Sequence, residues 1–172
     1  DYGDVIDEIA PADGIADFRM TSDGKCLFVA CFCALAQFRI DNYELVKAYR
    51  FGKTLQTVTA TWDSEYVFVG FFDRSLNQIC VEKQTVTKNY GMIHSDRIMR
   101  LQVARDNSFL VTGNEKGEAK IIEIESQKIV KDFDRIGSEI DPNNVKFNEG
   151  FNVGKTQLAR GDESLFVYED NC

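Results

Sequence analysis

The chain has 172 residues, of which 44% are hydrophobic and 12% aromatic, and its formal net charge is -8. This length predicts one domain over residues 1–172, and the interleaving of Lys and Arg with acidic residues argues against nucleic acid as a partner. The longest apolar run, CLFVACFCALA, is well short of the roughly 20 residues that a membrane-spanning helix needs, so no membrane partner is expected. Five cysteines, an odd number, sit mostly in apolar runs and favour reduced thiols in the cytoplasm.

A unit of about forty residues repeats along the chain, and such periods are typical of repeat folds. Asp23, Asp63 and Asp106 stand in the polar turns TSDGK, TWDSE and ARDNS, at spacings of 40 and 43 residues. Apolar residues recur eight and five positions before each aspartate, and small residues end the apolar run that follows it. A fourth unit is expected around Asn152. The predicted units are 10–51, 52–91, 92–134 and 135–172.

Each unit is predicted to contain four short strands, because apolar and β-branched runs alternate with Asp, Asn, Gly and Ser clusters. In the third unit the expected strands are 98–104, 109–113, 118–124 and 128–133. The opening stretch VIDEI, within residues 4–9, repeats the last strand of a unit and is expected to complete the sheet of the fourth.

The fold class predicted from this arithmetic is all-β, a β-propeller with about four blades of four antiparallel strands. Three arrangements remain open: a small closed ring, half of a larger dimeric propeller, and a fragment of a propeller with seven or eight blades. An unclosed arc would leave blade edges open to self-association.

The sequence resembles the WD-repeat (WD40) family over nearly the whole chain. His94-Ser95-Asp96-Arg97-Ile98 resembles the histidine segment that opens a family repeat, and Thr112-Gly113 ends the second strand as the family does. The resemblance implies that His94 and Thr112 are hydrogen-bonded and that Asp73 and Asp162 are turn acids, all four in structural roles. Lys116 and Ile122 stand where the family has its turn Asp and its Trp, so the repeats are degenerate.

His94, the single histidine, has three interpretations: a catalyst, a metal ligand, or a side chain that holds a turn. A zinc site needs several ligands and a general base needs a nucleophile and an orienting partner, and the sequence supplies neither set nearby. The structural role is favoured.

Three short motifs resemble functional sites but lack the neighbouring residues or secondary structure that such sites need. GFNVGKT, residues 150–156, has one residue too few for a phosphate-binding loop and is followed by strand-like sequence, so nucleotide binding is a minor alternative. Arg160-Gly161-Asp162 spells an adhesion tripeptide but falls in a blade turn, and Cys31 and Cys33 offer no further metal ligands.

The predicted function is a non-enzymatic scaffold of WD-repeat type that presents blade loops to a protein or peptide, without cofactor or metal. The loops expected on one face suggest a partner-binding set of exposed aromatic residues and arginines: Arg50, Phe71, Phe72, Arg74 and Arg160. Either of the adjacent phenylalanines is alternatively core, since neighbouring strand residues face opposite ways. The second hypothesis is a metal-dependent enzyme that uses turn carboxylates such as Asp63, Asp106 and Asp162 in the propeller channel.

Overall fold

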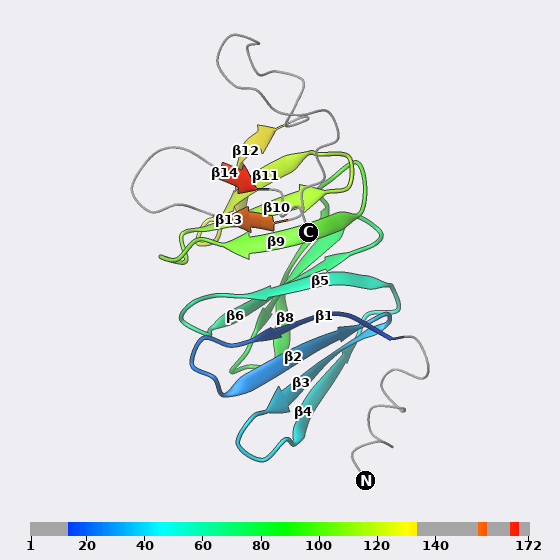
Figure 1. Cartoon of the computed structure of the whole chain (residues 1–172), viewed down its shortest axis with the longest axis vertical. Coiled ribbons are helices and arrows are strands. Elements are labelled where there is room, and N and C mark those ends of the chain that lie inside the picture. The colour runs from blue at the N-terminus through cyan, green and yellow to red at the C-terminus, as the bar shows by residue number, and fades with distance from the viewer. Residues whose placement is uncertain (1–13, 134–154, 158–165, 169–172) are drawn as a thin grey trace.

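The computed structural model describes residues 14–133, 155–157 and 166–168 (Figure 1). These residues form strands and turns and contain no helix, which confirms the all-β prediction. There are three four-stranded antiparallel sheets, here called blades 1 to 3, and one two-stranded sheet. In each blade, strands that follow one another in sequence are neighbours in the sheet.

Each blade consists of four consecutive strands. Blade 1 consists of β1 (Ile15–Met20), β2 (Cys26–Cys31), β3 (Ala34–Arg39) and β4 (Leu45–Arg50). Blade 2 consists of β5 (Leu55–Ala60), β6 (Tyr66–Phe71), β7 (Ser75–Cys80) and β8 (Thr85–Met92). Blade 3 consists of β9 (Ile98–Val103), β10 (Phe109–Asn114), β11 (Ala119–Glu123) and β12 (Lys128–Phe133). The hairpin of β13 (Lys155–Gln157) and β14 (Phe166–Tyr168) belongs to the fourth unit, most of which, like residues 4–9, lies outside the described residues.

The turn aspartates that mark the repeat perform the same local task in all three blades. Each carboxylate accepts a hydrogen bond from the backbone N–H two residues later, at 3.1 Å for Asp23, 2.9 Å for Asp63 and 3.0 Å for Asp106. The residue between has a positive φ in every case: Gly24, Ser64 and Asn107. An aspartate that bonds its own backbone in this way stabilises a tight turn, so the repeat is visible in the sequence through its turn chemistry.

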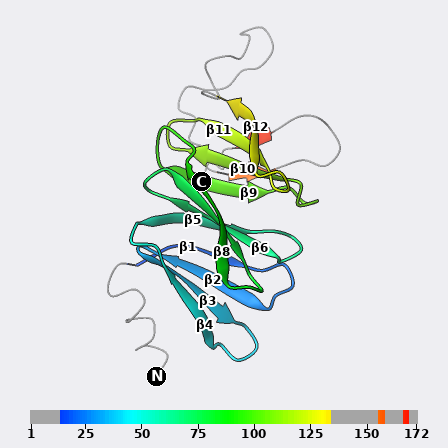
Figure 2. The same cartoon turned by 180° about the vertical axis from the view of Figure 1, so that it is seen from behind.

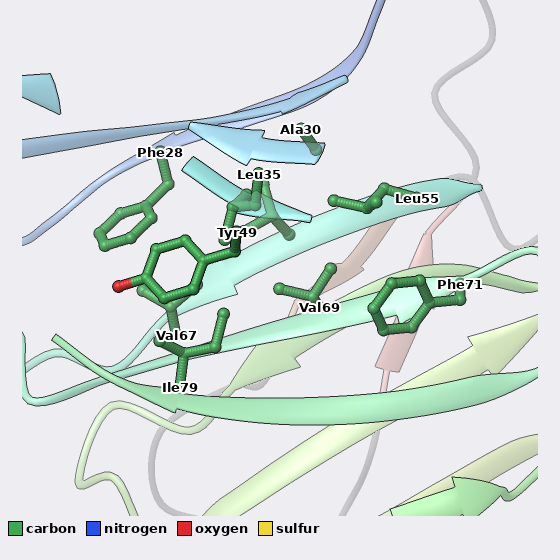
Figure 3. Packing of buried hydrophobic residues seen from close by; sticks show 10 residues of the cluster. Phe28, Ala30, Leu35, Tyr49, Leu55, Val67, Val69, Phe71 and Ile79 are labelled. Atoms are coloured by element: carbon green, nitrogen blue, oxygen red, sulfur yellow. The ribbon is translucent and has the colours of Figure 1, made fainter. Parts of the chain in front are cut away.

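The blades stack face to face, and their first strands β1, β5 and β9 run side by side (Figures 1 and 2). Phe28, Leu35 and Tyr49 of blade 1 pack against the neighbouring face of blade 2, in a core that contains Val58 and Ile79 (Figure 3). A second core joins the opposite face of blade 2 to blade 3 through Phe68, Leu76, Ile98, Leu101, Leu110 and Ile122.

Polar contacts reinforce this stacking. The Asp17 carboxylate of blade 1 accepts hydrogen bonds from Thr57 Oγ1 at 3.0 Å and from the Val58 backbone N–H at 2.9 Å. Between blades 2 and 3, the backbone N–H of Trp62 donates to Asn107 at 2.7 Å. Packing is also close near the first strands, because a Cβ placed on Gly70 would lie 2.9 Å from Ile98 Cγ2. Glycine at this position therefore lets two blades approach.

A Tyr–Gln hydrogen bond, buried in blade 1 and partly buried in blade 2, recurs between the third and fourth strands. The Tyr49 hydroxyl donates to Gln37 Oε1 at 2.9 Å in blade 1. The equivalent pair in blade 2 is Tyr90 and Gln78, at 3.0 Å. In blade 3 the two equivalent positions are occupied by Phe133 and Ile121. Because both of these residues are apolar, neither leaves a hydrogen-bonding group without its partner.

The described elements form an open arc. Strand β13 lies beside β9, while β1, at the other end of the row of first strands, lies beside β5 (Figures 1 and 2). One face of blade 1 therefore ends the arc.

Candidate functional site

The turns β2–β3, β6–β7 and β10–β11 lie on the same side of the arc as the linkers between blades. The Phe72 backbone N–H donates to Thr54 O at 2.9 Å and the Ile93 N–H donates to Arg74 O at 3.1 Å, which ties linker to turn twice. Residues 51–54, 72–74, 92–97 and 115–117 are called here the upper loop face. Loops held by a rigid sheet scaffold are common binding surfaces.

Phe72 is the most exposed aromatic residue of these turns and linkers. Its side chain is 52% exposed, and the Arg97 guanidinium lies 5.2 Å from the ring centroid. Arg97 is held in turn by Glu115, in an ion pair of 2.5 Å. The ring therefore has a fixed cationic support and one free face.

Arg74 stands beside Phe72 at a turn position with φ 74°. Its guanidinium lies 3.1 Å from Met92 Sδ, and Met92 is 66% exposed. Within residues 14–133 no carboxylate forms an ion pair with Arg74. The upper loop face thus combines apolar contact area with a cation that is available to an acidic group.

Phe71 does not belong to this surface, which corrects its place in the predicted partner-binding set. Phe71 is fully buried and makes a T-shaped contact with Phe51, at 5.0 Å between ring centroids. Lys53 Nζ lies 4.1 Å from the centroid of the Phe71 ring. Phe71 is the last residue of β6 and is buried in the core, whereas Phe72 is the first residue of the exposed turn that follows. Arg50 is exposed at the end of β4, and Arg160 lies outside the described residues.

Asp73 organises the turn that carries Phe72 and Arg74. Its carboxylate accepts a hydrogen bond from the Ser75 backbone N–H at 3.1 Å and lies 3.4 Å from Lys53 Nζ. Burial raises the pKa of Asp73, but the hydrogen bonds from Ser75 and the charge of Lys53 outweigh it, and the pKa is lowered. Its predicted counterpart Asp162 lies outside the described residues.

His94 is buried, and its Nε2 atom lies 2.7 Å from Thr112 Oγ1, the pair that the resemblance implies. Its Nδ1 atom lies 3.5 Å from Glu118 Oε2. Burial is the main reason that the pKa of His94 is lowered, although Glu118 opposes it. The imidazole is therefore neutral at pH 7. Its contact with Thr112 connects the linker between β8 and β9 to β10.

Glu118 is the residue that sequence reasoning missed. The acid was expected at position 116, where Lys116 instead pairs with Asp96 at 3.3 Å. Glu118, two residues later, accepts hydrogen bonds from Ser95 and, at 2.8 Å, from Asn114 Nδ2. Burial raises the pKa of Glu118, yet hydrogen bonds from Ser95 and His94 lower it overall. The sequence signal that could have identified Glu118 was the presence of a carboxylate next to the turn that contains Lys116.

The residues named for the metal-dependent alternative can be located in part. Asp63 and Asp106 are engaged in their own turns, and no group of three or more His, Cys, Asp or Glu side chains within these residues is placed to hold a metal ion. Lys155–Gln157 is a strand, whereas a phosphate-binding loop leads into a helix. No described helix is long and apolar enough to cross a membrane.

A groove of about 920 Å³ lies between blades 1 and 2, on the side of the turn aspartates. No motif in the sequence had indicated this groove. Charged residues such as Lys25, Arg39 and Glu82 line it, together with Cys26 and Cys80. Lys25 and Arg39 are paired with Asp23 and Asp41, so the groove offers no concentrated charge of one sign.

Solved structures with this arrangement of strands are known. The chain is similar to U3-55K, a WD40-type propeller protein, with a TM-score of 0.67 and 12% identity over 71% of this chain and 39% of the other. The fold is propeller-like. It is similar as well to the hydrazine synthase of Kuenenia stuttgartiensis, a propeller-containing enzyme, with a TM-score of 0.65 and 12% identity over 72% of this chain and 36% of the other. No family model matches the propeller-like chain, and no curated protein matches it.

Both similarities describe the fold. At 12% identity, neither similarity assigns a functional role to any residue of this chain. The chain spans well under half the length of each, and one is an enzyme while the other is not described as one. The function of this propeller-like chain has to be argued from its own residues.

Proposed function

We propose that the chain is a non-enzymatic scaffold of WD-repeat type that binds a protein or peptide through its upper loop face. The observation behind this proposal is the exposed ring of Phe72, held by Arg97 and flanked by Arg74 and Met92. Aromatic and arginine side chains dominate binding energy at protein interfaces. A ring that is already fixed loses little side-chain freedom on binding.

The chemistry of the face indicates the class of partner. Arg74 has no carboxylate partner within residues 14–133, while Phe72 and Met92 offer apolar area on either side of it. A peptide segment with an acidic residue next to an apolar one matches this pattern, because its carboxylate pairs with Arg74 while its apolar side chain covers the ring.

Two further features support the finer assignment. The His94–Thr112 pair, and Thr112–Gly113 near the end of β10, resemble those of WD repeats, with Glu118 as the acid beside the histidine. Cys26, Cys31, Cys33 and Cys80 are all free thiols, which suits a reducing compartment such as the cytoplasm.

The test is selection from a random peptide display library against the purified chain, followed by calorimetry with the selected peptides. We expect acidic–apolar peptides whose affinity falls at least about tenfold for Phe72→Ala and for Arg74→Ala, as expected at a hot spot. Val130→Ala is the matched control, since Val130 is 51% exposed on β12, away from these loops. Peptides whose binding is unchanged in both variants would contradict the proposal.

A further inference from the structure

Met92 lies beside Arg74 because the backbone of blade 2 holds the two residues together. Met92 is the last residue of β8 and is paired in register with Ser75, the first residue of β7. The Ile93 backbone N–H donates to the Arg74 carbonyl oxygen at 3.1 Å, one residue further along both chain segments. The contact of 3.1 Å between Met92 Sδ and Arg74 Nη2 is therefore built on a fixed backbone.

Met92 is the most exposed of the three methionines. It is 66% exposed, whereas Met20 is 54% exposed. Met99 is half-buried, and its Sδ atom lies 3.9 Å from Gln56 Nε2. A methionine thioether is oxidised to a sulfoxide, which is polar and can be reduced again. The sulfur of Met92 is thus open to reversible oxidation within the upper loop face.

Oxidation of Met92 changes its contact with Arg74. A thioether sulfur is only a weak hydrogen-bond acceptor, so in the reduced chain Met92 binds the guanidinium weakly. A sulfoxide oxygen is a much stronger acceptor, and it is bonded to the atom that already lies 3.1 Å from Arg74 Nη2. Hydrogen bonds from a charged donor are among the strong ones. Within residues 14–133 no carboxylate forms an ion pair with Arg74, so no stronger partner has to be displaced.

Two properties of the upper loop face are lost together when Met92 is oxidised. The side chain of Met92 is no longer apolar, and the guanidinium of Arg74 is occupied by the sulfoxide oxygen of its own chain. An acidic–apolar peptide needs the apolar area for its apolar side chain and the free guanidinium for its carboxylate. The consequence for peptide binding rests on the proposed function, whereas the pairing of Met92 with Arg74 does not.

We propose that Met92 is a peroxide-sensitive modification site, and that its sulfoxide binds Arg74, so that the upper loop face loses its acidic–apolar peptide partner. In the forward step one oxygen of hydrogen peroxide is transferred to Met92 Sδ, the O–O bond breaks and water leaves. The sulfur is oxidised by two electrons and the peroxide is reduced by two. In the reverse step two thiols supply two electrons and two protons, a disulfide and water form, and the thioether is restored.

Hydrogen peroxide treatment of the whole chain tests the proposal, with dithiothreitol added afterwards to reduce oxidised cysteines. Peptide mapping by mass spectrometry is expected to find sulfoxide at Met92 and Met20 before Met99. Calorimetry with the selected acidic–apolar peptides is expected to show at least about tenfold weaker binding after treatment. Met20→Leu should show the same loss, whereas Met92→Leu, compared with its own untreated form, should show none. Unchanged affinity of a chain oxidised at Met92, or an equal loss in Met92→Leu, overturns the proposal.

A second measurement is independent of any peptide. Phenylglyoxal modifies accessible guanidinium groups, and mass spectrometry gives the rate at each arginine. Arg74 is expected to react at least about threefold more slowly once Met92 is oxidised, because its guanidinium is then hydrogen-bonded. Arg105, which is exposed, is the internal control and should react at the same rate. Failure of the untreated chain to bind any peptide refutes the proposed function, whereas an unchanged rate at Arg74 refutes the present inference.

Discussion

Removal of the Tyr49 hydroxyl is expected to destabilise the fold through its hydrogen-bond partner. Tyr49 and Gln37 are 6% and 2% exposed, and their bond is 2.9 Å long. Burial raises the pKa of Tyr49 to about 12, so the hydroxyl is protonated and donates at neutral pH. Tyr49→Phe keeps the ring but leaves Gln37 Oε1 without this donor, and a buried unsatisfied acceptor costs about 1 to 3 kcal/mol.

Blade 3 shows how the cost is avoided, because it has Phe133 and Ile121 at these positions. In urea titrations, Tyr49→Phe with Gln37→Leu is therefore expected to be more stable than the sum of the single variants by roughly 1 to 2 kcal/mol. Tyr43→Phe is the control, since Tyr43 is 68% exposed and should cost almost nothing. Strict additivity in the double variant would refute the reasoning.

Three further predictions concern the buried His94, the close packing at Gly70 and the turn aspartates. Burial lowers the pKa of His94 from its ordinary 6.5, so below that pH the unfolded chain binds more protons than the folded chain. The unfolding free energy should therefore drop by up to about 1.4 kcal/mol for each pH unit below 6.5. Urea titrations should show a flatter pH dependence for His94→Gln. Gly70→Ala should cost about 1 to 3 kcal/mol by crowding Ile98 Cγ2, and Ile98→Leu should relieve part of that loss in the same titrations. Calcium, magnesium and zinc should not raise the Tm in a thermal-shift screen, because Asp63 and Asp106 serve their own turns; a clear rise would revive the metal-dependent enzyme.

Much of each blade was predictable because the signals are local. The turn aspartates mark where the strands begin, and the apolar and β-branched runs between the turns mark the strands themselves. The strands expected in the third unit agree closely with β9 to β12. The candidate site was predicted less well: Phe72 and Arg74 lie on the upper loop face, whereas Phe71 is core and the contribution of Arg97 was missed.

The sequence by itself determined the repeating unit, its four strands and the His94–Thr112 pair, since these follow from turn chemistry, short apolar runs and a short motif. Only the tertiary structure decided what depends on residues far apart in the chain. It turned Phe71 inward, placed Glu118 beside His94, and stacked the blades side by side along β1, β5 and β9. The physical reason is that a hydrogen bond within a turn needs a few neighbouring residues, whereas contact between blades depends on how whole sheets stack.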